Sequence, residues 1–196
     1  ALDMHFAAED ILITNGGSEA LQIAMNCILD DGDEILIPEP FYPNYNTMAR
    51  TCGAVIHPVS TSPEEGYFYA DRRRIEAEIT PRTRAILVTN PGNPTGTVLT
   101  HEEMEMLVDV ARQHDLFLIG DEAYREFVYA GEPLQSFGEF THAAENVPHR
   151  LPHLPQPGAH GPRYEVCSVP SGGADAGPVG LRRIVSGGAG VFRRRP

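Results

Sequence analysis

Short apolar runs of strand type alternate with helical patterns along residues 1–140, and this alternation limits the fold more than any other feature. Runs rich in β-branched residues indicate buried strands, and apolar positions three or four residues apart indicate helices. Strands that alternate with helices imply a mostly parallel sheet with helices on both faces. We therefore predict an incomplete three-layer α/β/α domain. The predicted strands cover residues 11–14, 34–38, 54–60, 85–90 and 116–121, and the predicted helices cover residues 18–29, 45–52, 71–79 and 101–114.

Residues 141–196 differ from the first 140 in composition and lack a helical or strand pattern. They hold 8 Pro and 9 Gly among 56 residues, a composition typical of disorder. Their charge is also reversed, with 7 Arg against 3 acidic residues. Two interpretations fit this stretch: a flexible native tail, and translation of a GC-rich gene out of frame. We therefore divide the chain into a partial domain at residues 1–140 and a tail, disordered or out of frame, at residues 141–196.

The composition narrows the class of protein. The formal net charge of −12 argues against nucleic acid and anionic membranes as partners, because both favour a positive surface. No apolar run reaches the length of a membrane span, and no signal peptide is expected at the N-terminus. Cys27, Cys52 and Cys167 are too scattered for a metal site or a disulfide framework. We expect a cytoplasmic protein without a bound metal.

Two motifs follow directly after predicted strands. NPGNPTG at residues 90–96 holds two Pro and two Gly, and such a run can neither continue a strand nor enter a helix, so it forms a shaped loop. Asn93 precedes Pro94 and is a candidate for a cis peptide. DEAY at residues 121–124 places Asp121 where a hydrophobic strand ends. Ligands bind at the carboxyl ends of strands in open α/β sheets, although an ordinary turn and a helix cap also explain these motifs.

Two further motifs occupy similar positions. TNGGSEAL at residues 14–21 leads from a strand through two glycines into a helix, an arrangement that offers backbone N–H groups to an anion such as phosphate. PEPFYPNY at residues 38–45 sets aromatic residues between prolines just past a strand. These aromatics are suited either to surface packing or to contact with a planar ring. Neither motif is specific when taken alone.

In this order and spacing, the four motifs resemble those of the fold-type I pyridoxal-phosphate-dependent aminotransferases, the class I/II family that includes aspartate aminotransferase. The resemblance runs from about residue 11 to residue 140 and covers only the middle of the family's large domain. It implies an α/β fold, pyridoxal 5′-phosphate as cofactor, and transamination between an α-amino acid and a 2-oxo acid. The chain is therefore expected to be a fragment of such an enzyme.

The resemblance also implies a role for each matching residue. Asp121 matches the carboxylate that pairs with the pyridine nitrogen of the cofactor and favours its protonated form. Tyr42 matches the aromatic residue that stacks on the pyridine ring. The other implied cofactor-binding residues are Gly17, Ser18 and Glu19 at the phosphate, and Asn93 and Tyr124 at the 3-oxygen of the ring.

One residue that the family requires is absent. All 15 residues in the Lys+Arg total are Arg, so the chain has no Schiff-base lysine. The resemblance places that lysine within residues 151–166, where neither it nor its surrounding motif occurs. Arginine cannot replace it, because a guanidinium stays protonated and is not a nucleophile near neutral pH. We therefore predict that this polypeptide is inactive or nearly so, although its family is enzymatic.

The resemblance implies small-molecule partners, namely an amino acid and a 2-oxo acid such as 2-oxoglutarate, and a homodimer. It also places Tyr45 close to a position that often reaches the partner subunit. Two alternatives remain open at this point. The chain is either a non-catalytic module that kept the site for pyridoxal or pyridoxamine phosphate, or part of another fold-type I enzyme such as a lyase or a carbon–carbon bond-forming enzyme.

Overall fold

The computed structural model describes residues 11–128, 136–140 and 180–182. A four-stranded sheet with the strand order β3-β2-β4-β5 forms its centre, and all neighbouring strands in it are parallel. The strands are β2 (Glu34–Pro38), β3 (Val55–Val59), β4 (Thr83–Thr89) and β5 (Phe117–Asp121). The helices are α1 (Gly17–Ile28), α2 (Asn44–Thr51), α3 (Arg72–Ala77) and α4 (His101–Gln113). Short 3-10 turns occur at η2 (Pro63–Glu65), η3 (Arg125–Phe127) and η4 (Phe137–Phe140).

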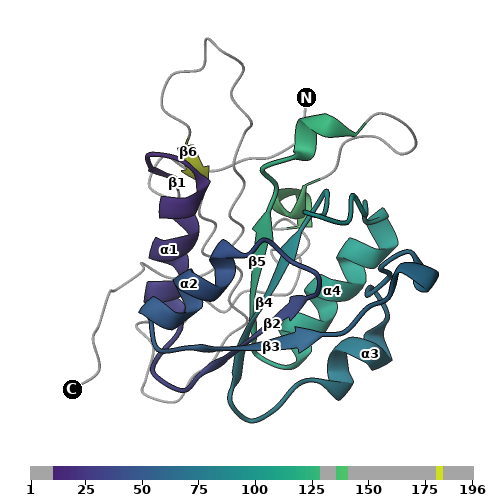
Figure 1. The fold of residues 1–196 in the computed structure, drawn as a ribbon, viewed down its shortest axis with the longest axis horizontal. Coiled ribbons are helices and arrows are strands. Elements are labelled where there is room, and N and C mark those ends of the chain that lie inside the picture. Colours follow the sequence, from purple (N-terminus) through teal and green to yellow (C-terminus); the bar gives the residue numbers. More distant parts are fainter. Residues whose placement is uncertain (1–10, 129–135, 141–179, 183–196) are drawn as a thin grey trace, which may run out of the picture.

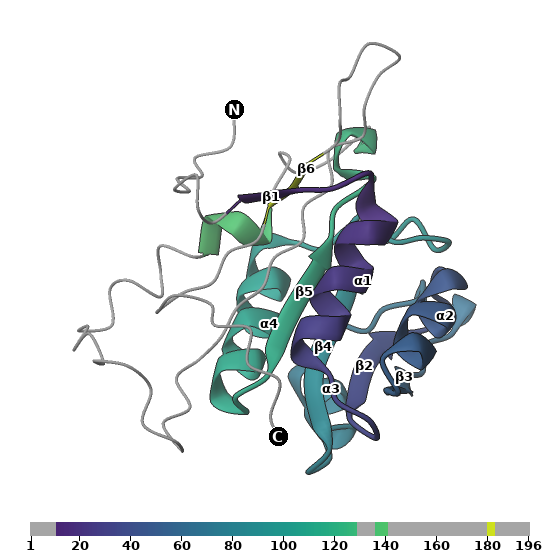
Figure 2. The same cartoon turned by 90° about the vertical axis from the view of Figure 1, so that its left-hand side faces the viewer.

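The helices form two layers, one on each face of the sheet (Figure 1; Figure 2). Ile35 and Ile37 belong to the core with α1 and α2, whereas Leu36 belongs to the core with α3 and α4. All three are at most 1% exposed. A strand that is buried on both faces reads as a continuous apolar run, which is why the predicted strand at residues 34–38 coincides with β2. The predicted three-layer α/β/α fold class is confirmed.

Strand ends differ from the prediction by one or two residues. The predicted strand at residues 54–60 is shorter in the structure, because only Val55–Val59 pair with β2. Strand β4 begins two residues early, because Thr83 pairs with Glu34 across a register shift. Pro58 lies within β3, at the edge of the sheet, where a residue without an N–H group leaves no ladder hydrogen bond unmade.

A second, small sheet joins distant parts of the chain. Strand β1 (Ile11–Ile13) pairs antiparallel with β6 (Gly180–Arg182). The sequence pattern indicated the first of these strands but not the second, which falls in the predicted tail. The rest of residues 141–196 lies outside the described residues, so the division of the chain into a domain and a tail stays a prediction.

Helix α4 begins with a capping box formed by Thr100 and Glu103. The Thr100 hydroxyl accepts a hydrogen bond from Glu103 N at 3.3 Å, and the Glu103 carboxylate accepts one from Thr100 N at 2.7 Å. The cap satisfies backbone N–H groups that the first turn of a helix leaves without a partner. Helix α4 covers one face of the sheet with Met104, Leu107 and Val110, all fully buried.

Replacing Thr100 with alanine is expected to lower the free energy of unfolding by about 1 kcal/mol, because an N-cap hydroxyl is lost. Urea unfolding followed by circular dichroism measures the change. Thr47→Ala is the matched control, since Thr47 is an exposed residue inside α2 and caps no helix. Equal losses in the two variants would show that the cap contributes nothing.

Candidate functional site

Asp121 is the last residue of β5 and lies beside the end of β4, where its register partner is Thr89. It is buried, with 7% of its surface exposed. One carboxylate oxygen, Oδ2, accepts a hydrogen bond from the Tyr45 hydroxyl at 2.6 Å, and Oδ1 accepts one from Ala123 N at 3.1 Å. Each oxygen keeps lone-pair capacity beyond these bonds, so Asp121 is able to accept from a further donor.

Tyr45 is the residue that holds the Asp121 carboxylate from α2. It is completely buried, and its hydroxyl also lies 2.8 Å from the Thr89 hydroxyl. Burial, and then the neighbouring Asp121 carboxylate, raise the pKa of Tyr45, so the phenol stays protonated and donates. The resemblance placed Tyr45 close to a position that often reaches the partner subunit, and that expectation stays a prediction; within this chain the side chain is buried against Thr89 and Asp121. Its spacing from the buried Met48 and Ala49 is the helical signal that marks this inward face.

Tyr42 lies in the wall of the same site. Its ring meets the Tyr45 ring edge-on, with the ring centroids 5.5 Å apart. Its hydroxyl accepts a hydrogen bond from the Asn44 amide at 2.7 Å. Phe41 is stacked against Tyr45 at 6.2 Å. The segment between β2 and α2 therefore brings two further aromatic rings next to the residue that holds Asp121.

The NPGNPTG loop leaves β4 beside Asp121, because Asn90 N donates a hydrogen bond to the Asp121 carbonyl at 2.9 Å. The loop is closed by Gly92 N, which donates to the Thr97 carbonyl at 2.7 Å. The Asn93 side-chain amide donates to the Tyr124 hydroxyl at 3.3 Å, so the loop contacts the DEAY motif directly. The peptide bond between Asn93 and Pro94 is cis, as the sequence suggested.

Helix α1 begins at Gly17, with Gly16 as its N-cap residue at φ 98°, a left-handed value that favours glycine. No side chain caps this end. The Glu19 carboxylate turns back and accepts a hydrogen bond from Asn15 N. The N-terminus of α1 lies at the end of the sheet where β4 and β5 finish (Figure 1; Figure 2). The first amides of α1, including those of Gly17 and Ser18, therefore face this end of the sheet and suit an anion.

Glu122, the second residue of DEAY, lies in a buried polar cluster that the sequence did not reveal. Its carboxylate accepts hydrogen bonds from the Ser136 hydroxyl at 2.8 and 3.0 Å and from Phe137 N at 2.8 Å. The Arg125 guanidinium lies 3.3 Å away. Burial raises the pKa of Glu122, and the bonds from Ser136, Phe137 N and Arg125 oppose that rise. Glu122 thus ties residues 136–137 to the turn that carries Asp121.

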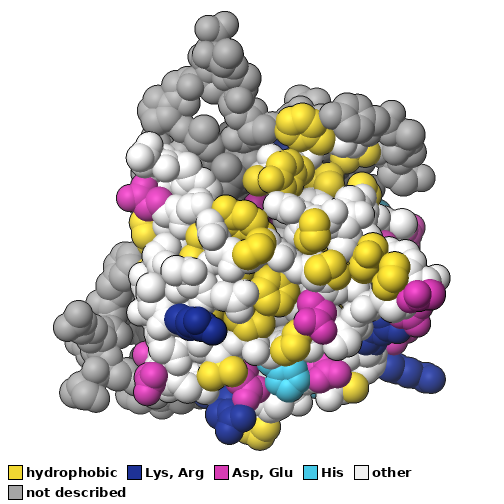
Figure 3. Space-filling model, in the orientation of Figure 1, with side chains coloured by type: hydrophobic (Ala, Val, Ile, Leu, Met, Phe, Trp, Pro, Cys, Tyr) yellow, Lys and Arg dark blue, Asp and Glu magenta, His cyan; other side chains and the backbone are white. Residues whose placement is uncertain are grey.

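The rim of the site exposes aromatic surface. Tyr124 is 42% exposed and Phe127 is 49% exposed, and their rings meet edge-on with centroids 6.2 Å apart. Figure 3 shows hydrophobic side chains gathered over the upper part of this face. Exposed apolar surface of this kind is typical of binding regions.

The arrangement suits a planar ligand with a cationic N–H group and an anionic tail. Asp121 offers the carboxylate, Tyr42 offers a ring, and the α1 N-terminus offers backbone donors. Across the described ranges, no group of three His, Cys, Asp or Glu side chains forms a metal site. Among the same residues, no helix is both long enough and apolar enough to cross a membrane.

The chain is similar to aminotransferases in three comparisons: with a family model, with the sequences of known proteins and with solved structures. The family model for aminotransferase class I and II matches residues 3–151. The aspartate/prephenate aminotransferase of Thermus thermophilus is 43% identical over 124 residues, which are 63% of this chain and 32% of that protein. The glutamate-pyruvate aminotransferase AlaA of Escherichia coli is 41% identical over 122 residues, or 62% of this chain and 30% of that protein.

The fold is similar to that of solved aminotransferases. The structure of a single mutant of the Thermus thermophilus aspartate aminotransferase matches with a TM-score of 0.67 and 35% identity. That match covers 85% of this chain and 38% of the solved chain. The chain therefore spans about a third of the length of the relatives it matches.

Proposed function

The chain belongs to the class I and II aminotransferases, and on that premise we propose that its protein transfers amino groups with pyridoxal 5′-phosphate as cofactor. Such transfer runs between an α-amino acid and a 2-oxo acid. The described residues supply one part of the cofactor site. The activity of the whole protein is a proposal, because the chain covers about a third of the length of its relatives.

The observation that carries the proposal is the buried Asp121 carboxylate, held at 2.6 Å by Tyr45 at the carboxyl end of β5. When bound, the cofactor supplies a ring that accepts electrons from the substrate's α-carbon. A carboxylate close to the ring nitrogen favours the protonated nitrogen, which is the better electron acceptor. Tyr45 and Ala123 N fix the orientation of Asp121 and leave it room to accept one more donor.

The remaining residues fit the same ligand by the chemistry of their donors. We assign the first amides of α1, at Gly17, Ser18 and Glu19, to the phosphate, because a helix N-terminus stabilises an anion. We propose that the Tyr42 ring stacks on the face of the cofactor's pyridine ring. Asn93 and Tyr124, which are already joined by a hydrogen bond of 3.3 Å, are assigned to the oxygen of the ring.

The substrate class follows from the relatives. Their names include aspartate/prephenate, glutamate–pyruvate and arginine–pyruvate aminotransferases. We propose an α-amino acid paired with a 2-oxo acid such as 2-oxoglutarate, a cytoplasmic location and a homodimer. The exposed Tyr124 and Phe127 support pairing with another copy, since exposed apolar surface is typical of interfaces.

A second function is favoured by one feature of the sequence. A polypeptide of these 196 residues contains no lysine, so it cannot form a covalent link between a lysine amine and the cofactor. We propose that this polypeptide binds the cofactor without turning over substrate. Binding and catalysis are therefore to be tested separately.

The experiment is a titration of the 196-residue chain with pyridoxamine 5′-phosphate, which needs no lysine for binding. We expect saturable binding, followed through the fluorescence of the ligand. Incubation with pyridoxal 5′-phosphate and borohydride is expected to leave no lysine adduct in the mass spectrum.

Two results would contradict the proposals. If the folded chain showed no saturable binding of pyridoxamine 5′-phosphate, the proposed cofactor site would be wrong. Turnover of an amino acid and 2-oxoglutarate by the same chain would contradict its predicted inactivity.

A further inference from the structure

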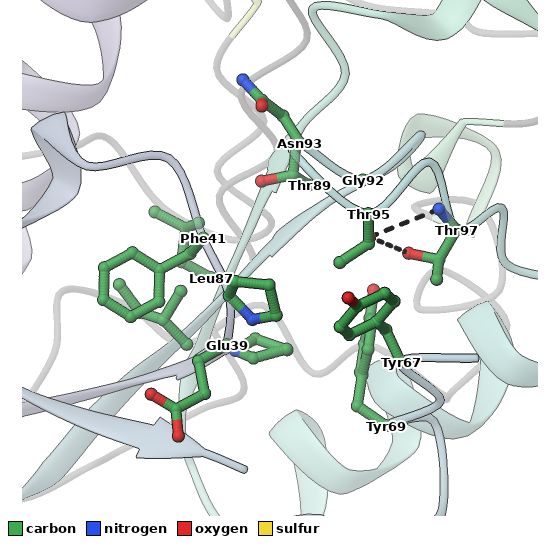
Figure 4. A pocket seen from close by; sticks show the side chains of 13 residues that line it. Glu39, Phe41, Tyr67, Tyr69, Leu87, Thr89, Gly92, Asn93, Thr95 and Thr97 are labelled. Carbon is green, nitrogen blue, oxygen red and sulfur yellow. Dashed lines mark hydrogen bonds between the residues drawn. The ribbon is translucent and has the colours of Figure 1, made fainter. Parts of the chain in front are cut away.

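Thr89 lies between the proposed cofactor site and the buried Tyr45, and the proposed function gives it no role. It is the last residue of β4 and the register partner of Asp121 in β5. Its side chain is half-buried and lines a small pocket together with Phe41 and Asn93. Figure 4 shows Thr89 and Asn93 together at one end of this pocket. Thr89 is therefore next to the place where we expect the cofactor ring.

The hydroxyl hydrogens of Thr89 and Tyr45 have one arrangement that satisfies both of their contacts. The Tyr45 hydroxyl lies 2.6 Å from Asp121 Oδ2 and 2.8 Å from Thr89 Oγ1. Burial raises the pKa of Tyr45, so the phenol keeps its one proton. An ionised carboxylate only accepts, so the Tyr45 proton is donated to Asp121. The contact between Thr89 and Tyr45 must then use the proton of Thr89.

The three side chains thus form a chain of hydrogen bonds that runs in one direction, from Thr89 through Tyr45 to Asp121. Hydrogen bonds in such a chain polarise one another, so the donation from Thr89 makes Tyr45 a stronger donor. A carboxylate shares its negative charge among the donors that it accepts from. The stronger the bond from Tyr45, the less charge Asp121 offers to a further, cationic donor.

We propose that Thr89 is a positioning residue, which orients the Tyr45 hydroxyl toward Asp121 and so moderates the attraction of this carboxylate for the ring nitrogen of the cofactor. Thr89 acts through Tyr45 and needs no contact with the ring. The effect on the cofactor rests on the proposed function. The direction of the hydrogen bonds does not, because it follows from contacts among side chains of this chain.

Thr89→Val tests the chain of hydrogen bonds in the cofactor-free protein, because valine keeps the branched shape and lacks the hydroxyl. We expect the melting temperature to fall by about 3 °C. In a double-mutant cycle with Asp121→Asn, the double variant should lose less than the sum of the two single losses. The reason is that Tyr45 then no longer donates to a charged acceptor, so the donation from Thr89 has less to strengthen.

A second cycle, of Thr97→Val with Asp121→Asn, is the matched control. Thr97 is also a half-buried threonine, but its hydroxyl lies 2.9 Å from that of Thr95, so its loss should add to that of Asp121→Asn. Strictly additive losses in the Thr89 cycle, or equal coupling in the Thr97 cycle, would overturn the proposal.

Binding of pyridoxamine 5′-phosphate tests the effect on Asp121. Thr89→Val should bind this ligand about twofold more tightly, since a change of roughly 10–30% in a charge-assisted hydrogen bond has about this size. Thr89→Ser keeps the hydroxyl and should bind as the original chain does, and so should Thr97→Val. A purely structural role predicts the opposite sign, because a less stable site binds its ligand more weakly. Unchanged or weaker binding by Thr89→Val, or the same gain in Thr89→Ser, would contradict the role of Thr89.

The two experiments separate this proposal from the proposed function. Absence of binding by the original chain would contradict the cofactor site, whereas the stability cycles would still decide whether Thr89 acts through Tyr45 on Asp121. Saturable binding by the original chain, with the same affinity in Thr89→Val, would support the cofactor site and remove the role of Thr89.

Discussion

Asp121→Ala is expected to weaken the binding of pyridoxamine 5′-phosphate by about 100-fold, equivalent to roughly 3 kcal/mol. The variant removes the carboxylate that we assign to the protonated ring nitrogen, and a hydrogen bond between charged groups in a buried site is among the stronger ones. Tyr45 is not left without a partner, because Thr89 Oγ1 remains 2.8 Å from its hydroxyl. The loss should therefore appear in ligand affinity, with a small effect on folding.

Two further variants separate charge from shape. Asp121→Asn keeps an oxygen able to accept from Tyr45 or from Ala123 N but carries no charge, so it should lose most of the same affinity. Asp109→Asn removes a carboxylate on α4 whose ion pair, within the described part of the chain, is with the half-exposed Arg112, and it should bind as the original chain does. If Asp121→Ala bound the ligand with unchanged affinity and an unchanged spectrum, the assignment of Asp121 would be wrong.

Local sequence predicted the sheet well where burial is strong. The run at residues 34–38 is buried on both faces, as is expected of a strand in the middle of a layered α/β domain. The start of α4 was equally clear, because Thr100 and Glu103 form a local motif. Strand ends were less clear, since pairing across strands decides them. Thr83 joins β4 because Glu34 lies opposite it, and no pattern within residues 83–89 shows that.

The candidate site was predictable as a set of motifs but not as a set of contacts. Asp121 ends a strand and Asn93 and Tyr42 follow strands, and parallel strands bring such positions to one end of a sheet. Their roles stay predictions. The bond from Tyr45 to Asp121 joins residues 76 positions apart, and the inward turn of Tyr45 depends on the packing of α2. The Glu122 cluster was missed for the same reason, because its hydrogen bonds to Ser136 and Phe137 form only in the folded core.

Glu122→Ala is expected to lower the free energy of unfolding by about 3–5 kcal/mol, a large part of the stability of an ordinary domain. The carboxylate accepts from Ser136 Oγ and Phe137 N and lies 3.3 Å from Arg125, all at a position that is 1% exposed. Alanine would leave the donors of Ser136, Phe137 and Arg125 buried without the carboxylate that accepts from them. The desolvation cost of such unsatisfied donors exceeds the net contribution of a single hydrogen bond to stability. Urea unfolding measures the loss. Glu105→Ala, on the exposed side of α4, is the control and should change stability by less than about 0.5 kcal/mol.

Glu122→Gln adds a test of the charge. Glutamine keeps an oxygen that accepts from Ser136 and Phe137 N but cannot titrate. Burial raises the pKa of Glu122 in the folded chain, so the folded state holds its proton to a higher pH than the unfolded state does. The stability of the original chain should therefore rise, relative to Glu122→Gln, as the pH falls from the raised value to the ordinary glutamate value, and stay constant below that. A difference that shrank over this interval would mean that Arg125 and the hydrogen bonds outweigh burial, and that the pKa of Glu122 is lowered instead.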